Sequence, residues 1–186
     1  HYHSTPFFYE ANKTSNNFHF SNEHLQVLSR RVIDRLYFPS AYRPGCHTER
    51  PDSNLFLEQW VPIDYGNQGM PESKEDALQS DIGGGRYGDW RRATTDWVAY
   101  NPSHDDYQVK GNCRRFIGRA LNVLNRIASI NDFEMEKAFS QANNGNPALV
   151  GFASHDFRDL SHEVNYLREM INKASKKYPD VKFFYI

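Results

Sequence analysis

The feature that most constrains this fold is the alternation of strand-like and helix-like segments along the chain. Apolar residues recur at helical spacing in some stretches and form short unbroken runs in others. Segments in the order strand, helix, strand, helix, strand favour parallel strands joined by crossover helices. The sequence therefore predicts an α/β fold, either an α/β barrel or an open α/β sheet. Any functional site should lie at the carboxyl ends of the strands.

The clearest helix in the amino-terminal part is predicted for residues Asn22 to Tyr37. Ser21 can cap it and Pro39 ends it. Its apolar residues at helical spacing are Leu25, Leu28, Val32 and Leu36. By contrast, residues Arg43 to Asp106 combine proline, glycine and aromatic residues with little periodicity, which indicates long loops carrying short strands.

The carboxyl-terminal part continues the alternation. Residues Gly111 to Ile130 carry an apolar stripe at helical spacing, which predicts a helix. The arginines of this stretch fall largely off the stripe, and they are Arg114, Arg115, Arg119 and Arg126. The segments predicted to follow are a short helix capped by Asp132 and ending at Ala142, a strand from Pro147 to Phe152, a helix from Ser161 to Lys177 and a closing strand from Val181 to Ile186. The residues of the last helix expected to face inward are Val164, Leu167, Ile171 and Ala174.

Composition limits the partners of the chain. Its 186 residues suffice for one α/β domain with a sizeable core, so a single domain over residues 1–186 is predicted. The 22 Lys and Arg nearly balance the 23 Asp and Glu, which removes the positive field that non-specific nucleic-acid binding needs. No apolar stretch approaches the roughly 20 residues of a membrane helix. Aromatic residues, at 15%, can line a cleft as well as a core, which suits stacking on sugars.

The two cysteines, Cys46 and Cys113, have neither a CxxC spacing nor a dense disulfide pattern. We predict two unpaired thiols, because a bridge between them would need an oxidising compartment. The start of the chain shows no charged region of a signal peptide. The compartment therefore stays open, and both a cytoplasmic and an exported protein are compatible with the sequence.

Histidines provide the best candidate metal ligands. His1 and His3 are spaced i, i+2, so on an extended strand both imidazoles point to the same side and can reach one ion. His155 follows directly on the apolar run from Ala148 to Phe152, at the predicted carboxyl end of a buried strand. It can face that ion across a cleft. In the alternative interpretation, the first pair is only solvated and His155 is only satisfied by a helix N-terminus.

In their order along the chain, these residues resemble the metal-dependent polysaccharide deacetylases of carbohydrate esterase family 4, whose NodB-homology fold is a distorted (β/α) barrel. The stretch from His1 to Phe7 is similar to the family's motif with two histidines. Residues Tyr42 to Gly45 resemble its aromatic-Arg-x-Gly motif, and Pro62 to Tyr65 resemble the segment with an aspartate that follows. Ser154 to Phe157 is similar to the motif that carries the last histidine.

The resemblance implies a hydrolase of C–N bonds other than peptide bonds, which removes an N-acetyl or O-acetyl group from a polysaccharide or related sugar. Its metal ligands would be His1 and His3, holding a divalent ion, expected to be zinc, with an open position for water. His155 would be the catalytic acid, and Arg43 would orient the base through a bidentate pair. The residues expected to contact the acetylated carbohydrate are Asp64, Trp90, Trp97, Tyr100 and His104.

One motif of this family has no counterpart in the chain. The aspartate-rich strand end that supplies a metal-binding carboxylate and the water-activating base would precede His1. We therefore expect the carboxyl-terminal part of a deacetylase-like domain, an incomplete barrel with an incomplete catalytic centre. The alternative is a non-catalytic carbohydrate-binding or scaffold relative with the same fold. As an alternative to their roles above, Trp90 and Trp97 would pack in the core or loops, and Arg43 would bridge two loops.

Overall fold

The computed structural model describes residues 2–4, 21–49, 57–71, 88–125, 127–155 and 157–186, without the side chains of residues 2–4, 21–25 and 27. The chain divides into two compact units. Unit 1 comprises His1–Thr95 and Ala99–Gly118, and unit 2 comprises Asp96–Val98 and Arg119–Ile186. That the two units make up the single predicted domain stays a prediction.

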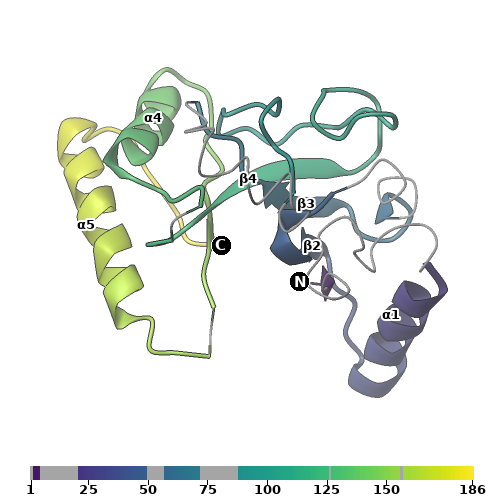
Figure 1. The fold of residues 1–186 in the computed structure, drawn as a ribbon. Coiled ribbons are helices and arrows are strands. Elements are labelled where there is room, and N and C mark those ends of the chain that lie inside the picture. The colour runs from purple at the N-terminus through teal and green to yellow at the C-terminus, as the bar shows by residue number, and fades with distance from the viewer. Residues whose placement is uncertain (1, 5–20, 50–56, 72–87, 126, 156) are drawn as a thin grey trace. The chain divides into compact units, whose positions relative to one another are not determined.

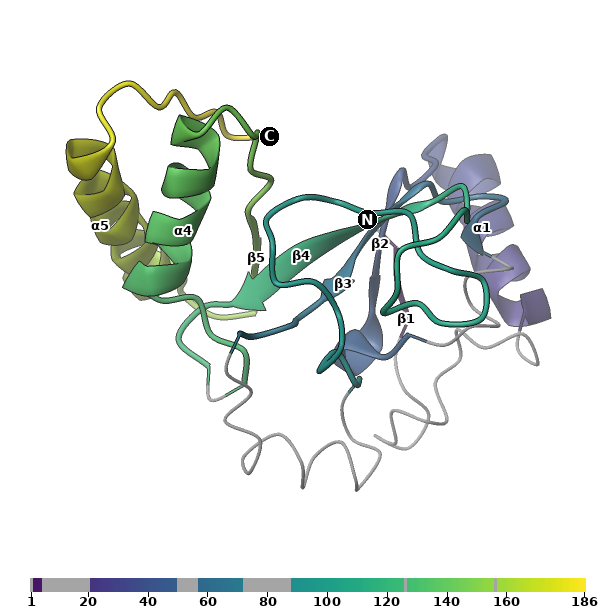
Figure 2. The ribbon, with the colours of Figure 1, turned by 90° about the horizontal axis from the view of Figure 1, so that it is seen from above.

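The described strands are β1 (Tyr2–Ser4), β2 (Ala41–Pro44), β3 (Ile63–Asn67), β4 (Phe116–Asn122) and β5 (Gly151–Ala153). They neighbour one another in sequence order, β1-β2-β3-β4-β5 (Figures 1 and 2). In unit 1, β2 pairs in parallel with both β1 and β3, and in unit 2 the end of β4 pairs in parallel with β5. The predicted α/β class with parallel strands is confirmed. This order is compatible with an incomplete (β/α) barrel.

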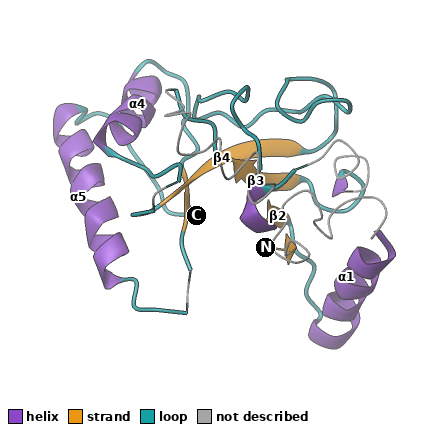
Figure 3. Ribbon diagram, viewed as in Figure 1, coloured by secondary structure: helices purple, strands orange, loops and turns teal. Residues whose placement is uncertain are grey.

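The predicted helices outside Gly111 to Ile130 are confirmed (Figure 3). They are α1 (Ser21–Arg35), α4 (Asp132–Asn143) and α5 (Ser161–Lys177). The cap of α4 is not Asp132, as predicted, but Asn131, whose side chain accepts a hydrogen bond from the Glu134 N–H at 2.9 Å. Asn131, one residue earlier than the predicted cap, accepts from a backbone N–H that has no partner within the helix, so the helix begins at Asp132.

Only part of the apolar stripe of α1 is buried. Leu28 is buried and clusters with Tyr42 of β2, Leu57 and Val61. In contrast, Val32 and Leu36 have exposed fractions of 40% and 92%, and Leu36 has a positive φ of 49° beyond the helix end. The helical spacing therefore predicted the helix, and of the stripe residues whose side chains are described, only Leu28 packs in the core of unit 1.

The predicted helix from Gly111 to Ile130 is wrong, because this stretch contains strand β4. All but the first residue of β4 is buried, on both faces of the strand. A run buried on both faces has no two-residue alternation of polar and apolar residues, so its pattern also fits a buried helix. After β4 the backbone turns at Leu124 and Ala128, with φ of 50° and 42°. A right-handed helix cannot contain such residues.

The predicted closing strand from Val181 to Ile186 is also wrong, because this segment has no regular structure. Its aromatic residues make ring contacts instead: Phe183 lies 6.0 Å from Phe139 of α4 and 5.8 Å from Tyr185, between ring centroids. The apolar run that resembles a strand thus supplies rings to a helix surface without forming a ladder of backbone hydrogen bonds.

Helix α5 buries part of the face that its spacing predicted. Ile171 and Ala174 are buried, as expected, whereas Val164 is 44% exposed. The helix contacts α4, where Lys173 lies 2.8 Å from Asp132. Among the helices that the structure describes, none combines the length and the apolar content needed to cross a membrane.

Candidate functional site

A buried histidine organises the polar residues at the carboxyl ends of β2 and β3. His47 ends the 3₁₀ helix Gly45–His47, which follows β2 directly, and only 1% of its surface is exposed. Its Nε2 lies 2.7 Å from Arg43 Nη2 and 2.8 Å from Gln68 Nε2, and its Nδ1 lies 3.2 Å from the Gly66 carbonyl. A guanidinium only donates and a carbonyl only accepts. His47 is therefore neutral, with its proton on Nδ1 and its Nε2 accepting.

The backbone around His47 is held in an unusual conformation. Cys46 and His47 have φ of 49° and 52°, the left-handed region that costs a residue with a side chain about 1–2 kcal/mol. Two hydrogen bonds from a later segment hold this turn in place. The Gly88 N–H donates to the Cys46 carbonyl at 3.0 Å, and the Trp90 indole N–H donates to the His47 carbonyl at 2.7 Å. Such strained turns, fixed by their surroundings, are found most often at functional sites.

A buried arginine joins β3 to the segment after the 3₁₀ helix. Asp64 of β3 accepts the Gly66 N–H at 2.6 Å with Oδ1 and binds Arg115 Nη2 with Oδ2. Arg115 Nη2 also lies 3.6 Å from Glu49 Oε2, and all three side chains are fully buried or nearly so. Burial alone would lower the pKa of Arg115, but the carboxylates of Asp64 and Glu49 raise it. The guanidinium therefore stays charged, and it fixes both carboxylates in position.

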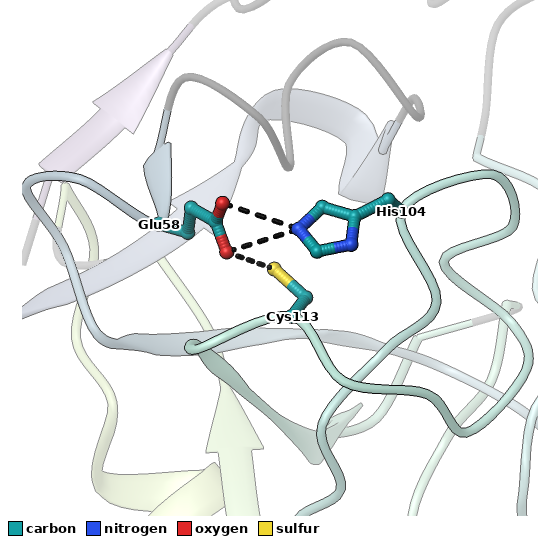
Figure 4. Close-up of side chains that lie close together, drawn as sticks. All are labelled: Glu58, His104 and Cys113. Atoms are coloured by element: carbon teal, nitrogen blue, oxygen red, sulfur yellow. Dashed lines mark hydrogen bonds and ion pairs between the residues drawn. The ribbon is translucent and has the colours of Figure 1, made fainter.

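A second group of ionisable side chains in unit 1 consists of Glu58, His104 and Cys113 (Figure 4). His104 Nε2 lies 3.1 and 3.2 Å from the two carboxylate oxygens of Glu58. Cys113 Sγ and the Arg114 N–H both donate to Glu58 Oε2, at 3.0 Å each. One ligand atom from each of the three side chains lies within 4.8 Å of the others, so the group could hold a metal ion.

Without a metal ion, Glu58 and Cys113 have shifted pKa values that fix which of them carries the proton. Burial alone would raise the pKa of Glu58, but the hydrogen bonds from Cys113, the Arg114 N–H and His104 outweigh it and lower that pKa to about 2. Burial, together with the neighbouring Glu58 carboxylate, raises the pKa of the Cys113 thiol to about 11. At neutral pH the group is thus a carboxylate that accepts from a thiol.

The predicted metal ligands lie at the edge of what the structure describes. His1 is outside the described residues, and for His3 the backbone but not the side chain is described. His3 belongs to β1 and is in register with Arg43 of β2. The next strand, β3, carries Asp64, in register with Tyr42. The predicted residues His3, Arg43 and Asp64 therefore come from three consecutive parallel strands of one unit.

The predicted acid, His155, follows β5 in unit 2. Its side chain is exposed and stacks at a tilt on Phe157, with 5.3 Å between ring centroids. Asp156 lies outside the described residues. The predicted role of His155 beside the other site residues stays a prediction.

The predicted sugar-stacking aromatic residues are buried. Trp90 is 3% exposed and meets Tyr107 edge to face, with centroids 4.9 Å apart, and Tyr100 is 4% exposed and donates to the Tyr107 carbonyl at 2.7 Å. Burial raises the pKa of both Tyr100 and Tyr107. Trp97, in unit 2, is fully buried and donates to the Glu134 carbonyl at 3.1 Å. These positions match the packing alternative, and the contact with a sugar stays a prediction.

The structure joins some predicted residues and adds others that the sequence did not single out. Arg43 and Asp64 are linked through His47 and Gly66, whereas His104 belongs to the group with Glu58 and Cys113. Both cysteines are free thiols, as predicted. The short spacing between Arg43 and His47 was a usable signal for the first network. Nothing local signals Glu58 or Arg115, since their partners lie 46 to 66 residues away along the chain.

Comparison with known proteins gave no match. No family model matches the sequence, and no curated protein and no solved structure is significantly similar to it. The resemblance to polysaccharide deacetylases therefore stays a prediction that rests on its motifs.

Proposed function

We propose that this chain belongs to a metal-dependent hydrolase of the polysaccharide deacetylase type, which removes an acetyl group from a polysaccharide or related sugar. The observation that carries the proposal is the placement of the motif residues. His3 is in register with Arg43 on the neighbouring parallel strand, and Asp64 lies on the strand after that. Motifs from consecutive parallel strands converge at one end of a sheet, where α/β enzymes keep their sites.

The donor types fit the ion that this class of enzyme uses. His1 and His3 offer imidazole nitrogens, which zinc binds well, and His3 belongs to the extended strand β1. Extended backbone would place two imidazoles spaced i, i+2 on one side. We propose a divalent ion, zinc, at these histidines together with a carboxylate from an upstream segment. When bound, the ion would polarise the acetyl carbonyl and activate a water molecule.

The described residues have supporting roles in this proposal. Arg43 would hold the upstream carboxylate in a fixed orientation, and its own guanidinium is positioned by the hydrogen bond to the neutral ring of His47. Asp64 is fully buried and is fixed by Arg115 and the Gly66 N–H, so it would hold the end of β3 in place beside the site. His155 would give a proton to the departing amine or alcohol.

The test measures acetate released from an acetylated chitooligosaccharide and from an acetylated xylan, with bound metal quantified by mass spectrometry. It uses this chain and, where the gene encodes more residues upstream, the extended chain. We expect release with stoichiometric metal, and a loss of at least about 100-fold in the double variant His1→Ala, His3→Ala. His162→Ala, which changes an exposed histidine of α5, is the matched control and should keep full activity.

Acetate release that survives the double histidine substitution would overturn the proposed metal centre. Absence of both metal and activity in every form of the chain would instead favour the non-catalytic carbohydrate-binding relative. Metal without release from either substrate would refute the sugar substrate and leave an amide of another kind to be sought.

A further inference from the structure

The Glu58, His104 and Cys113 side chains have the geometry of a cation site that is separate from the proposed catalytic histidines. Four-coordinate zinc has ligand distances of about 2.0–2.3 Å, so neighbouring ligand atoms around it lie about 3.3–3.8 Å apart. The carboxylate oxygens of Glu58 lie 3.0 Å from Cys113 Sγ and 3.1 Å from His104 Nε2, and all three ligand atoms lie within 4.8 Å. Shifts of about 1 Å or less would bring them onto one tetrahedron.

The three side chains come from two segments of unit 1. Glu58 belongs to a turn just after Leu57, and His104 and Cys113 lie on the loop that leads into β4. In Figure 4 the three functional groups point toward one another from these separate segments. Convergence of side chains more than 40 residues apart is a property of the fold and not of local sequence.

The chemistry of the set selects among cations. A thiolate with an imidazole and a carboxylate suits zinc and related transition metals, whereas calcium and magnesium prefer oxygen ligands alone. Thiolate and carboxylate together would neutralise a divalent ion, which favours binding at a mostly buried position. The side chains of Glu58 and His104 have exposed fractions of 12% and 36%, so an ion can arrive through the His104 side.

The alternative role for this group, a nucleophilic cysteine, has the wrong arrangement. A nucleophilic thiol needs a base that accepts its proton and remains as a cation beside the thiolate. Here the Cys113 Sγ–H points to the Glu58 carboxylate, and Cys113 is only 1% exposed. A substrate could not reach the sulfur without displacing the loop.

We propose that Glu58, His104 and Cys113 bind a zinc ion that ties the turn after Leu57 to the loop before β4. Binding forms a metal–Sγ bond while the Cys113 thiol proton passes to solvent, and the metal replaces the thiol hydrogen bond to Glu58. Three protein ligands leave a fourth position for water. Because Cys113 is two residues from Arg115, the bound ion also fixes the residues just before β4, where Arg115 meets Asp64. This proposal does not depend on the proposed deacetylase activity.

Cobalt(II) is the probe that identifies the ligands, because thiolate coordination gives it an intense charge-transfer absorption. We expect the metal-free full chain to bind cobalt with this band, and zinc to displace it. Cys113→Ser should abolish the band, and His104→Ala and Glu58→Gln should each weaken binding at least about 10-fold. Cys46→Ser, which changes the other free thiol, is the matched control and should keep the band.

The double variant His1→Ala, His3→Ala separates this site from the proposed catalytic ion. It should lose acetate release and keep the thiolate band, so failure of one proposal leaves the other measurable. A band that persists in Cys113→Ser, or that disappears in Cys46→Ser, would overturn the site. So would a wild-type chain that binds cobalt without a thiolate band, or that binds no cobalt at all. A zinc-induced rise in Tm that is absent in Glu58→Gln would give independent support, whereas an equal rise in both would contradict it.

Discussion

Two arginines four residues apart in the sequence are both fully buried, one in each unit, and they are held in different ways. In unit 2, Arg119 forms two parallel hydrogen bonds to Glu134, at 2.5 and 3.0 Å, and its guanidinium lies 4.4 Å from the centre of the Trp97 ring. In unit 1, Arg115 is shared by Asp64 and Glu49, and it lies 5.7 Å from the Tyr42 ring.

Arg119 therefore forms a structural ion pair, whereas Arg115 belongs to a network that positions several polar groups. The bidentate pair of unit 2 ties one helix, α4, to one strand. The arginine of unit 1 instead connects side chains from β3 and from the segment after His47, on the same strands as the proposed site. Unit 2 thus uses a buried ion pair to fix its core, and unit 1 uses one to arrange polar residues next to the strand ends.

The largest effect is expected from Glu134→Gln, which keeps the shape of the side chain and removes the charge that faces Arg119. A buried charge that loses its partner typically costs about 3–5 kcal/mol of stability. Glu49→Gln in unit 1 should cost less, about 1–2 kcal/mol, because Arg115 keeps Asp64. Urea unfolding of both variants measures the difference.

Glu136→Gln is the control for this pair of variants. Glu136 lies two residues after Glu134, but its side chain is 47% exposed and forms an ion pair with Lys177. We expect its change in unfolding free energy to stay below about 1 kcal/mol. A cost for Glu49→Gln equal to or above that of Glu134→Gln would reverse the contrast drawn between the units.

A smaller effect, about 3 kcal/mol, is expected from Gly88→Ala in unit 1. A Cβ atom at Gly88 would stand 1.8 Å from the His47 carbonyl oxygen, so the turn that holds His47 would have to move. The matched glycine of unit 2 is Gly145, where a Cβ would meet nothing within 4 Å but φ is +83°. Gly145→Ala should therefore cost only about 1 kcal/mol, the price of a left-handed residue. Thermal unfolding of both variants would sharpen the comparison, and a tolerated Gly88→Ala would show that the His47 turn is not tightly held.

The smallest effect concerns acid stability of the metal-free chain. The pKa of Glu58 falls from its ordinary value of 4.5 to about 2 on folding. Its contribution is therefore fully present above pH 4.5 and is lost as the pH falls toward 2. With solvent screening this amounts to on the order of 1 kcal/mol. Urea midpoints measured with a chelator between pH 5 and 2.5 should fall more steeply for the wild type than for Glu58→Gln, and parallel curves would contradict the assignment.

Sequence reasoning succeeded where local signals decide the structure. Helices α1, α4 and α5 followed from apolar spacing and end signals, and the parallel α/β class followed from the order of the segments. It failed at β4, because a strand buried on both faces carries no two-residue alternation, and Arg119 of β4 together with the preceding Arg115 resembles the polar face of a helix. Burial of Arg115 and Arg119 depends on carboxylates that are distant in the sequence.

In the candidate sites, too, local sequence signals predicted some residues, and contacts between distant segments determined the others. Arg43 and Asp64 were singled out by motif order, and the structure places them on neighbouring parallel strands. His47 was passed over although it lies four residues after Arg43, because nothing local indicates that its ring accepts from both Arg43 and Gln68. Glu58 and Cys113 were missed as a pair because a turn and a loop bring them together. Tertiary contacts of this kind have no periodic signature.

The membership of Trp97 in unit 2 has a consequence for how the protein is made. This residue leaves the ribosome well before its main partners: Arg119 covers its ring, Glu134 accepts its indole N–H, and the Leu149 N–H binds its carbonyl. During synthesis the Trp97 indole therefore lacks its buried surroundings until about fifty further residues have been added to the chain. A chain stopped at the end of unit 1 would carry that indole without its partners, so a gene cut at this boundary should yield a product that chaperones retain or proteases degrade.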